Sequence, residues 1–124
     1  MVSIYAKVVG ALLFIVGILG GIPAFAPDGM LFGVFMVDTV HNLFHLISGL
    51  VLLAAGFGVQ WEVSRRLVLG FAIVYGLLTL AGFLSPTGRV LGMQFNMADN
   101  VLHLTLTATA LMFALPVQRY PTRL

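Results

Sequence analysis

Residues 8–26 read VVGALLFIVGILGGIPAFA and carry no charged side chain. As an α-helix, these 19 residues would be about 28 Å long, which is close to the thickness of the hydrocarbon core of a bilayer. Three more stretches, residues 39–60, 67–84 and 101–117, are equally free of Lys, Arg, Asp and Glu. The sequence therefore predicts an all-α, integral membrane four-helix bundle.

The composition of the whole chain agrees with a membrane protein and excludes other classes. Of 124 residues, 60% are hydrophobic and only 8% are charged, whereas soluble domains carry about 25% charged residues. So few charges cannot cover a water-exposed surface, which excludes an ordinary soluble enzyme, a nucleic-acid-binding protein and a disordered tail. The absence of cysteine excludes disulfides, thiolate zinc sites, iron–sulfur clusters and cysteine nucleophiles. We expect a single membrane domain over residues 1–124.

The Lys and Arg residues are distributed unevenly between the two sides of the predicted bundle. Arg89 alone falls on one side, and the other five fall on the opposite side. Because Lys and Arg accumulate on the cytoplasmic side of membrane proteins, we expect a multi-pass protein of the inner (plasma) membrane with both termini in the cytoplasm. The five residues expected on the cytoplasmic side are Lys7, Arg65, Arg66, Arg119 and Arg123.

The two halves of the chain resemble each other. Residues 25–29 (FAPDG) match residues 84–88 (LSPTG), and residues 38–46 (DTVHNLFHL) match residues 96–104 (NMADNVLHL). Each half predicts a helical hairpin, at about residues 8–58 and 67–116, in which an outer loop precedes an Asn-x-x-His motif. Because each hairpin contains two spans, both would insert the same way up. We therefore expect tandem parallel repeats, related by a pseudo-two-fold axis along the membrane normal.

The first span also resembles a secretory signal, because Lys7 precedes the apolar run and small residues flank Phe25 as at a cleavage site. Pro27 is a poor residue to follow a cut. The second half also offers a matching span that cannot be a signal, so we expect the first span to be retained.

The two outer loops, residues 27–37 and 86–95, are unusually apolar for connecting segments. Irregular backbone is tolerated at membrane depth only where protein or water satisfies its polar groups. We expect both loops to lie at the membrane interface or to cover the bundle as a lid.

A polar stripe opens the second helix of each hairpin. Within each half, four polar residues fall within an arc of about 100° on one helical face. Facing lipid would cost such a stripe several kcal/mol, so we expect it to face the bundle interior. Below it, Gly49 and Gly56 would let spans two and four cross closely with their stripes facing each other. The stripe residues are Asp38, His41, Asn42, His45, Asn96, Asp99, Asn100 and His103.

The first interpretation of this polar cluster is structural. Asp38 and Asn96 are favourable N-cap residues, and hydrogen bonds across the cluster would hold the two hairpins together. We expect His41 to approach Asp99, directly or through one water. His45 and His103 would lie close to each other and pair with Asn100 and Asn42. We predict no catalytic residue and no cofactor under this interpretation.

The alternatives assign a ligand to the same residues. His41 and His45 at i, i+4 could share a zinc ion with His103, with Asp38 or Asp99 as fourth ligand or supporting group. A haem b could bind between His45 and His103. A titrating His/Asp set could also handle protons or a small solute. No hydroxyl nucleophile or additional base is evident beside the cluster, so enzymatic activity is not the favoured function.

The two motifs together resemble a known family. The run HNLFHL at residues 41–46, preceded by Gly33 and Asp38, with NMADNVLHL at residues 96–104, resembles the bacterial membrane family catalogued as domain of unknown function 4383. The resemblance extends from about Ala6 to Leu115 and implies four spans with paired Asn/His motifs; Asp38 departs from the asparagine expected there. It implies no reaction or cofactor. The expected partners are the lipid bilayer and either a second copy of the chain or another membrane subunit, with no nucleic acid.

Overall fold

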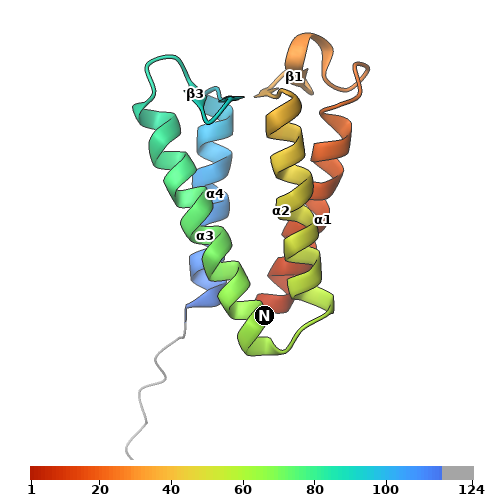
Figure 1. Ribbon diagram of the computed structural model, residues 1–124, viewed down its shortest axis with the longest axis vertical. Coiled ribbons are helices and arrows are strands. Elements are labelled where there is room, and N and C mark those ends of the chain that lie inside the picture. Colours follow the sequence, from red (N-terminus) through yellow and green to blue (C-terminus); the bar gives the residue numbers. More distant parts are fainter. Residues whose placement is uncertain (116–124) are drawn as a thin grey trace, which may run out of the picture.

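The computed structural model describes residues 1–115, and these residues form an all-α, membrane-compatible four-helix bundle. Two helical hairpins lie side by side, α1 with α2 and α3 with α4, and both outer loops lie at the end of the molecule opposite the N-terminus (Figure 1). The helices are α1 Val2–Leu19, α2 Thr39–Phe57, α3 Trp61–Leu84 and α4 Met97–Ala114.

Three helices, α1, α2 and α3, are long and apolar enough to cross a bilayer. The fourth expected span, α4, is as long as α1 at 18 residues, but Asp99, Asn100 and His103 occupy its first two turns. Further along α4, the hydroxyl groups of Thr105 and Thr107 donate to the carbonyl oxygens four residues earlier. The threonines therefore satisfy their polar groups inside the helix, which a bilayer environment requires.

The outer faces of the helices are apolar. Along α1 the exposed large side chains recur at helical spacing, and α2, α3 and α4 show similar exposed apolar faces. An apolar surface of this extent is incompatible with a soluble monomer and fits contact with lipid. The exposed apolar residues of α1 are Ile4, Val8, Leu12, Ile15 and Ile18.

Two helix boundaries differ from the sequence prediction. Helix α1 covers Val2–Leu19 instead of residues 8–26. It begins before Lys7 because residues on that side of the charge, such as Tyr5, are buried in the core. Helix α3 begins at Trp61, so it includes charged residues that precede the uncharged stretch 67–84. Charged residues mark the end of an apolar run, but they do not end a helix: Glu62 accepts from both Arg65 and Arg66 within the first turns of α3.

Glycines bring α1 and α2 into close contact. A Cβ added at Gly49 of α2 would lie 2.6 Å from the backbone nitrogen of Phe14 and 2.8 Å from the carbonyl oxygen of Gly10, both in α1. Gly56 approaches the backbone of Lys7 in the same way. The expectation that these glycines pack spans two and four together is therefore wrong. The closest packing lies within each hairpin, because consecutive antiparallel helices meet along their full length.

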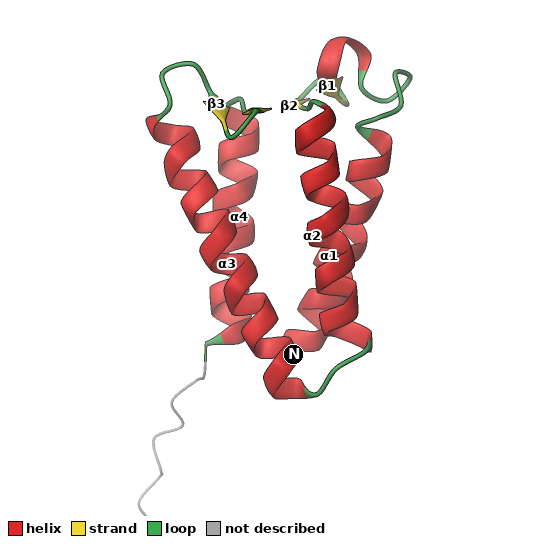
Figure 2. Ribbon diagram, in the orientation of Figure 1, coloured by secondary structure: helices red, strands yellow, loops and turns green. Residues whose placement is uncertain are grey.

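Each outer loop contains a short β-hairpin, which the sequence did not predict (Figure 2). In the first loop the turn η1 Pro27–Gly29 precedes β1 Met30–Leu31 and β2 Phe35–Met36, and in the second β3 Arg89–Val90 pairs with β4 Met93–Gln94. Both hairpin turns combine a non-glycine residue and a glycine at positive φ, Phe32–Gly33 and Leu91–Gly92. Leu91 is 83% exposed at its tip, whereas Met93 and Phe95 are buried. Met93 and Phe95 therefore face the bundle and cover its end, whereas Leu91 faces away from it.

Candidate functional site

The eight polar residues of the predicted stripe all lie at the loop end of the bundle, on the first turns of α2 and α4. Six of them fall into two groups with different contacts, and Asn42 and Asn100 belong to neither group. The first group, which we name the outer tie, hydrogen-bonds to the backbone and consists of Asp38, Asn96 and Asp99. The second group, which we name the histidine cluster, consists of His41, His45 and His103.

Both helix starts are capped as the sequence predicts. The Oδ1 atom of Asp38 accepts from the backbone nitrogen of His41 at 2.8 Å, at the start of α2. At the start of α4, Asn96 accepts from the backbone nitrogen of Asp99 and Asp99 accepts from that of Asn96, which forms a reciprocal capping box. These caps fix the direction in which each helix leaves its loop, and so place the histidines one and two turns further on.

The outer tie also connects the two hairpins. Asp38 accepts from the backbone nitrogen of Gln94 at 2.6 Å, in the other hairpin's loop. Asp99 in turn accepts from the backbone nitrogen of Met36 at 3.2 Å, in the first loop. The Asn96 side chain donates to the carbonyl oxygen of Val34 at 2.8 Å. Each hairpin thus inserts a carboxylate into the loop of the other, at the positions where the strands leave backbone groups free.

The histidine cluster brings three imidazoles together from two helices. Ring nitrogens of His41 and His45, on α2, and of His103, on α4, all lie within 4.8 Å of one another. The three side chains are 0%, 4% and 2% exposed, in the same order. Their ring centroids are separated by 4.4 Å for His41–His45, 5.6 Å for His41–His103 and 6.1 Å for His45–His103.

These imidazoles have few polar partners. Within residues 1–115, both ring nitrogens of His41, both of His45 and Nδ1 of His103 make no hydrogen bond. A contact between His41 and Asp99 through one water stays a prediction, but the predicted direct hydrogen bond between them is wrong. Asp99 uses its Oδ2 atom for the backbone nitrogens of Asn96 and Met36 instead.

The predicted pairs of histidine with asparagine are also wrong. The Oδ1 atoms of Asn42 and Asn100 have no hydrogen-bond partner in the part of the chain that the structure describes. Both amides pack against a glycine of their own hairpin. A Cβ added at Gly20 would collide with the Asn42 side chain, and one added at Gly82 would collide with that of Asn100.

Aromatic rings complete the walls of the histidine cluster. The Phe95 ring lies edge-on to His41 and to His103, at 4.9 Å from each. Tyr75 of α3 lies edge-on to His103 at 5.4 Å. Sequence reasoning missed Phe95 and Tyr75, because no local pattern distinguishes them from other apolar core residues. The cluster is thus a set of nitrogen donors enclosed by apolar rings.

No curated protein and no solved structure shows a significant match to this chain. A family model does match, and it extends over residues 3–116, which includes both Asn-x-x-His motifs and both outer loops. Its description assigns no activity. The chain belongs to the family described as domain of unknown function 4383.

Proposed function

We propose that this protein is a multi-pass membrane protein that binds one transition-metal ion through His41, His45 and His103. The observation that carries the proposal is the convergence of three buried imidazoles whose ligand atoms lie within 4.8 Å of one another. A buried polar atom without a partner is costly, so a cluster of such nitrogens calls for a compensating interaction. A bound cation supplies that interaction for all three rings at once.

The ring positions suit a single ion. Zinc–nitrogen distances of about 2.0–2.1 Å with tetrahedral angles put the centroids of neighbouring imidazoles about 5 Å apart. The observed centroid separations of 4.4, 5.6 and 6.1 Å bracket that value. Small side-chain rotations would therefore bring the three rings onto one ion without moving the helices.

The donor set indicates the kind of metal. Imidazole suits zinc, copper, iron and nickel, whereas magnesium and calcium require oxygen ligands. Asp38 and Asp99 lie at the starts of the helices that carry the histidines, and their carboxylates accept backbone N–H groups. Two nearby negative charges would balance a divalent cation in an apolar environment. We therefore place zinc first.

The arrangement favours an ion over haem b. The His41 ring lies 4.4 Å from His45 and 5.6 Å from His103. The Phe95 ring lies 4.9 Å from His103. A porphyrin bound between His45 and His103 would need the space that the His41 and Phe95 rings occupy. A single ion needs no such space.

A second candidate function is structural, and the outer tie favours it. Asp38, Asn96 and Asp99 make three hydrogen bonds between the two hairpins. Under this function the polar cluster stabilises the association of the hairpins and binds no ligand. The hydrogen bonds of the outer tie do not involve the imidazole rings, so the two functions can be separated by experiment.

The proposal includes the placement in the membrane. We propose four spans, with α4 as the fourth, in a bacterial inner membrane, with both termini cytoplasmic and the histidine cluster near the extracytoplasmic face. Lys7, Arg65 and Arg66 belong to the end of the bundle opposite the loops, and Arg89 belongs to a loop. Arg119 and Arg123 lie outside the described residues. Matching positive-φ turns in the two loops support the tandem parallel repeat.

Metal analysis of the purified protein in detergent tests this function. We expect one zinc per chain after zinc loading and removal of excess, and His45→Ala or His103→Ala should weaken binding by on the order of 10- to 100-fold or more. Asn100→Ala is the matched control, because it removes a buried polar group from α4 without removing an imidazole. Wild-type protein that retains no zinc, or histidine variants that retain as much as Asn100→Ala, would refute the metal function. A Soret band would indicate haem.

A further inference from the structure

An ion bound to the histidine cluster would be shut off from water, because the three histidine side chains are at most 4% exposed. A divalent cation does not dissolve in the apolar part of a bilayer, so it must arrive from an aqueous side. The loop end of the bundle is the nearer of the two, since all three histidines lie in the first two turns of α2 and α4. Some group at the loop end must therefore move before an ion can enter or leave.

Phe95 of the second loop covers the cluster at that end. Its ring lies edge-on to both His41 and His103, with a centroid separation of 4.9 Å in each case. These two histidines belong to different hairpins, so one ring spans the junction between α2 and α4. Phe95 directly follows β4 and precedes Asn96, the N-cap of α4, and is 3% exposed.

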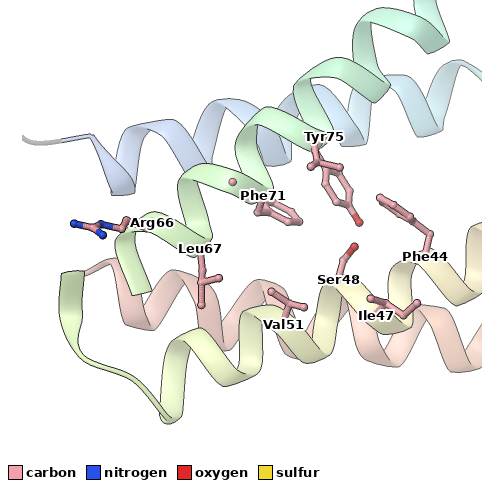
Figure 3. A pocket seen from close by; sticks show the side chains of 10 residues that line it. Phe44, Ile47, Ser48, Val51, Arg66, Leu67, Phe71 and Tyr75 are labelled. Carbon is pink, nitrogen blue, oxygen red and sulfur yellow. The ribbon is translucent and has the colours of Figure 1, made fainter. Parts of the chain in front are cut away.

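The side of the cluster toward α3 is closed by rings that belong to the helices themselves. Tyr75 lies edge-on to His103 at 5.4 Å, and the rings of Phe44 and Phe71 lie 5.7 Å and 4.2 Å from that of Tyr75. Figure 3 shows these three rings between α2 and α3. Tyr75 is 1% exposed near the middle of α3, so displacing it would require the two helices to separate. A loop side chain can move with much less disturbance.

The backbone at Phe95 is fixed, which confines movement to its ring. The backbone nitrogen of Phe95 donates to the carbonyl oxygen of Gly88 at 2.8 Å. The backbone nitrogen of the preceding residue, Gln94, donates to Asp38 of the other hairpin, and the following residue, Asn96, caps α4. The ring can still turn about its own side-chain bonds.

The ring also has space nearby. It packs in an apolar cluster with Leu78, Phe44 and Val90, and these three neighbours line an open groove of about 500 Å³ beside the second loop. A small shift of these side chains into the groove would leave room for the phenyl ring to turn. The half-buried carboxylate of Asp38 lies at the same end and would attract a cation to the opening.

We propose that Phe95 is the gate of the histidine cluster: its ring covers a bound ion at the loop end, and rotation of the ring lets the ion pass. This inference rests on the metal function proposed above. It adds the route that the ion takes and the side chain that controls the rate of its exchange.

The first half of the chain offers a matched control. Val37 occupies the position equivalent to Phe95, because its backbone nitrogen donates to the carbonyl oxygen of Gly29 at 2.8 Å, just as Phe95 donates to Gly88. Val37 is also buried, but it packs with a separate apolar cluster in the first loop. Val37→Ala therefore weakens a loop at the same structural position without uncovering the imidazoles.

The transfer of zinc from the loaded protein in detergent to an excess of a chromogenic chelator tests the gate. We expect Phe95→Ala to release zinc about tenfold faster than the wild type or more, because the ring no longer blocks the path to water. Uptake should accelerate by a similar factor, so the zinc affinity should change much less than the release rate. Val37→Ala should release zinc at the wild-type rate.

Phe95→Leu separates the gate from folding. It keeps an apolar side chain in the cluster with Leu78 and Met93, but lacks the flat ring that reaches both His41 and His103. We expect a folded protein that releases zinc faster than the wild type.

Three results would overturn the gate. One zinc per chain with equal release rates in the wild type, Phe95→Ala and Phe95→Leu would overturn it and leave the metal function standing. Faster release matched by an equal loss of affinity would also overturn it, because the ring would then stabilise the bound ion instead of controlling its passage. A wild type that retains no zinc would overturn both the gate and the metal function.

Discussion

At the scale of single residues, Asp38 and Asp99 each perform two tasks with one carboxylate. Asp99 is 2% exposed, and its Oδ2 atom accepts from Asn96 in its own hairpin and from Met36 in the other. Asp38 caps α2 with Oδ1 and contacts Gln94 of the other loop with Oδ2. Charge-assisted bonds to backbone N–H groups are among the stronger hydrogen bonds, and here they link local caps to the association of the hairpins.

The first prediction concerns Asp99→Ala. It leaves the backbone nitrogens of Met36 and Asn96 without their acceptor, so we expect the free energy of unfolding to fall by about 1–3 kcal/mol. Thermal unfolding in detergent measures the change. Asp28→Asn is the control, because it removes a carboxylate charge from an exposed loop residue. Asp28 has a left-handed backbone conformation, which asparagine also adopts readily. Equal stability of the two variants would show that the hydrogen bonds accepted by Asp99 do not stabilise the protein.

Some of this site could be predicted from the sequence because it depends on local chain geometry. The caps at Asp38 and Asn96 follow from residue type and position, and His41 and His45 share a face because they are four residues apart. The partner of Asp99 could not be predicted. It is a backbone nitrogen whose position depends on the path of a loop 63 residues away. Asp99 accepts a hydrogen bond from that backbone nitrogen and not from its predicted partner, His41.

At the scale of helices, glycines determine how closely α1 and α2 pack. Gly10 and Gly49 face each other, so each backbone lies where the other residue's Cβ would be. Small residues at such crossings are the usual means of helix association in bilayers, where lipid is as apolar as leucine. Gly70 of α3 has no atom near its missing Cβ and makes no such contact.

The second prediction compares these two glycines. Gly49→Ala should lower the free energy of unfolding by about 1–3 kcal/mol, because the new methyl group meets the Phe14 and Gly10 backbones and the helices must separate. Gly70→Ala should leave stability unchanged or raise it by up to about 1 kcal/mol, because alanine is the better helix former. Unfolding in detergent with increasing SDS would compare them. A Gly49→Ala variant as stable as Gly70→Ala would contradict the close packing.

The number and order of the helices could be predicted, but their ends could not. Apolar runs identify the part of a helix inside the bilayer, whereas α3 continues into its charged turn at Trp61–Arg66. There Arg65 donates to the carbonyl oxygen of Ala114, at the end of α4, a contact between segments 49 residues apart. The strands of the loops are two residues long each, which is too short for any periodicity to reveal.

At the scale of the whole molecule, the two hairpins are joined at two levels. The outer tie joins them at the loop end. Nearer the opposite end, the Tyr5 hydroxyl of α1 donates to the carbonyl oxygen of Leu106 in α4, at 2.8 Å, and the Tyr5 ring stacks on Phe113. Together these contacts hold the histidines of α2 opposite the histidine of α4.

The third prediction concerns orientation in the membrane. The chain contains no cysteine, so single cysteines can be introduced at exposed positions of both loops, Val34→Cys and Thr87→Cys, and of the opposite turn, Gln60→Cys. An impermeant thiol reagent added to intact cells should label both loop cysteines and leave Gln60→Cys unlabelled. Labelling of the two loops from different sides would contradict the parallel repeat. Labelling of Gln60→Cys from outside would reverse the topology.

X-ray absorption of the zinc-loaded protein tests whether His41, His45 and His103 share one ion. We expect nitrogen donors at about 2.0–2.1 Å from the zinc, with the more distant scattering of about three imidazoles. His103→Ala should reduce that imidazole signal, and Asn100→Ala should leave it unchanged. A shell of oxygen donors without imidazole scattering would contradict the claim.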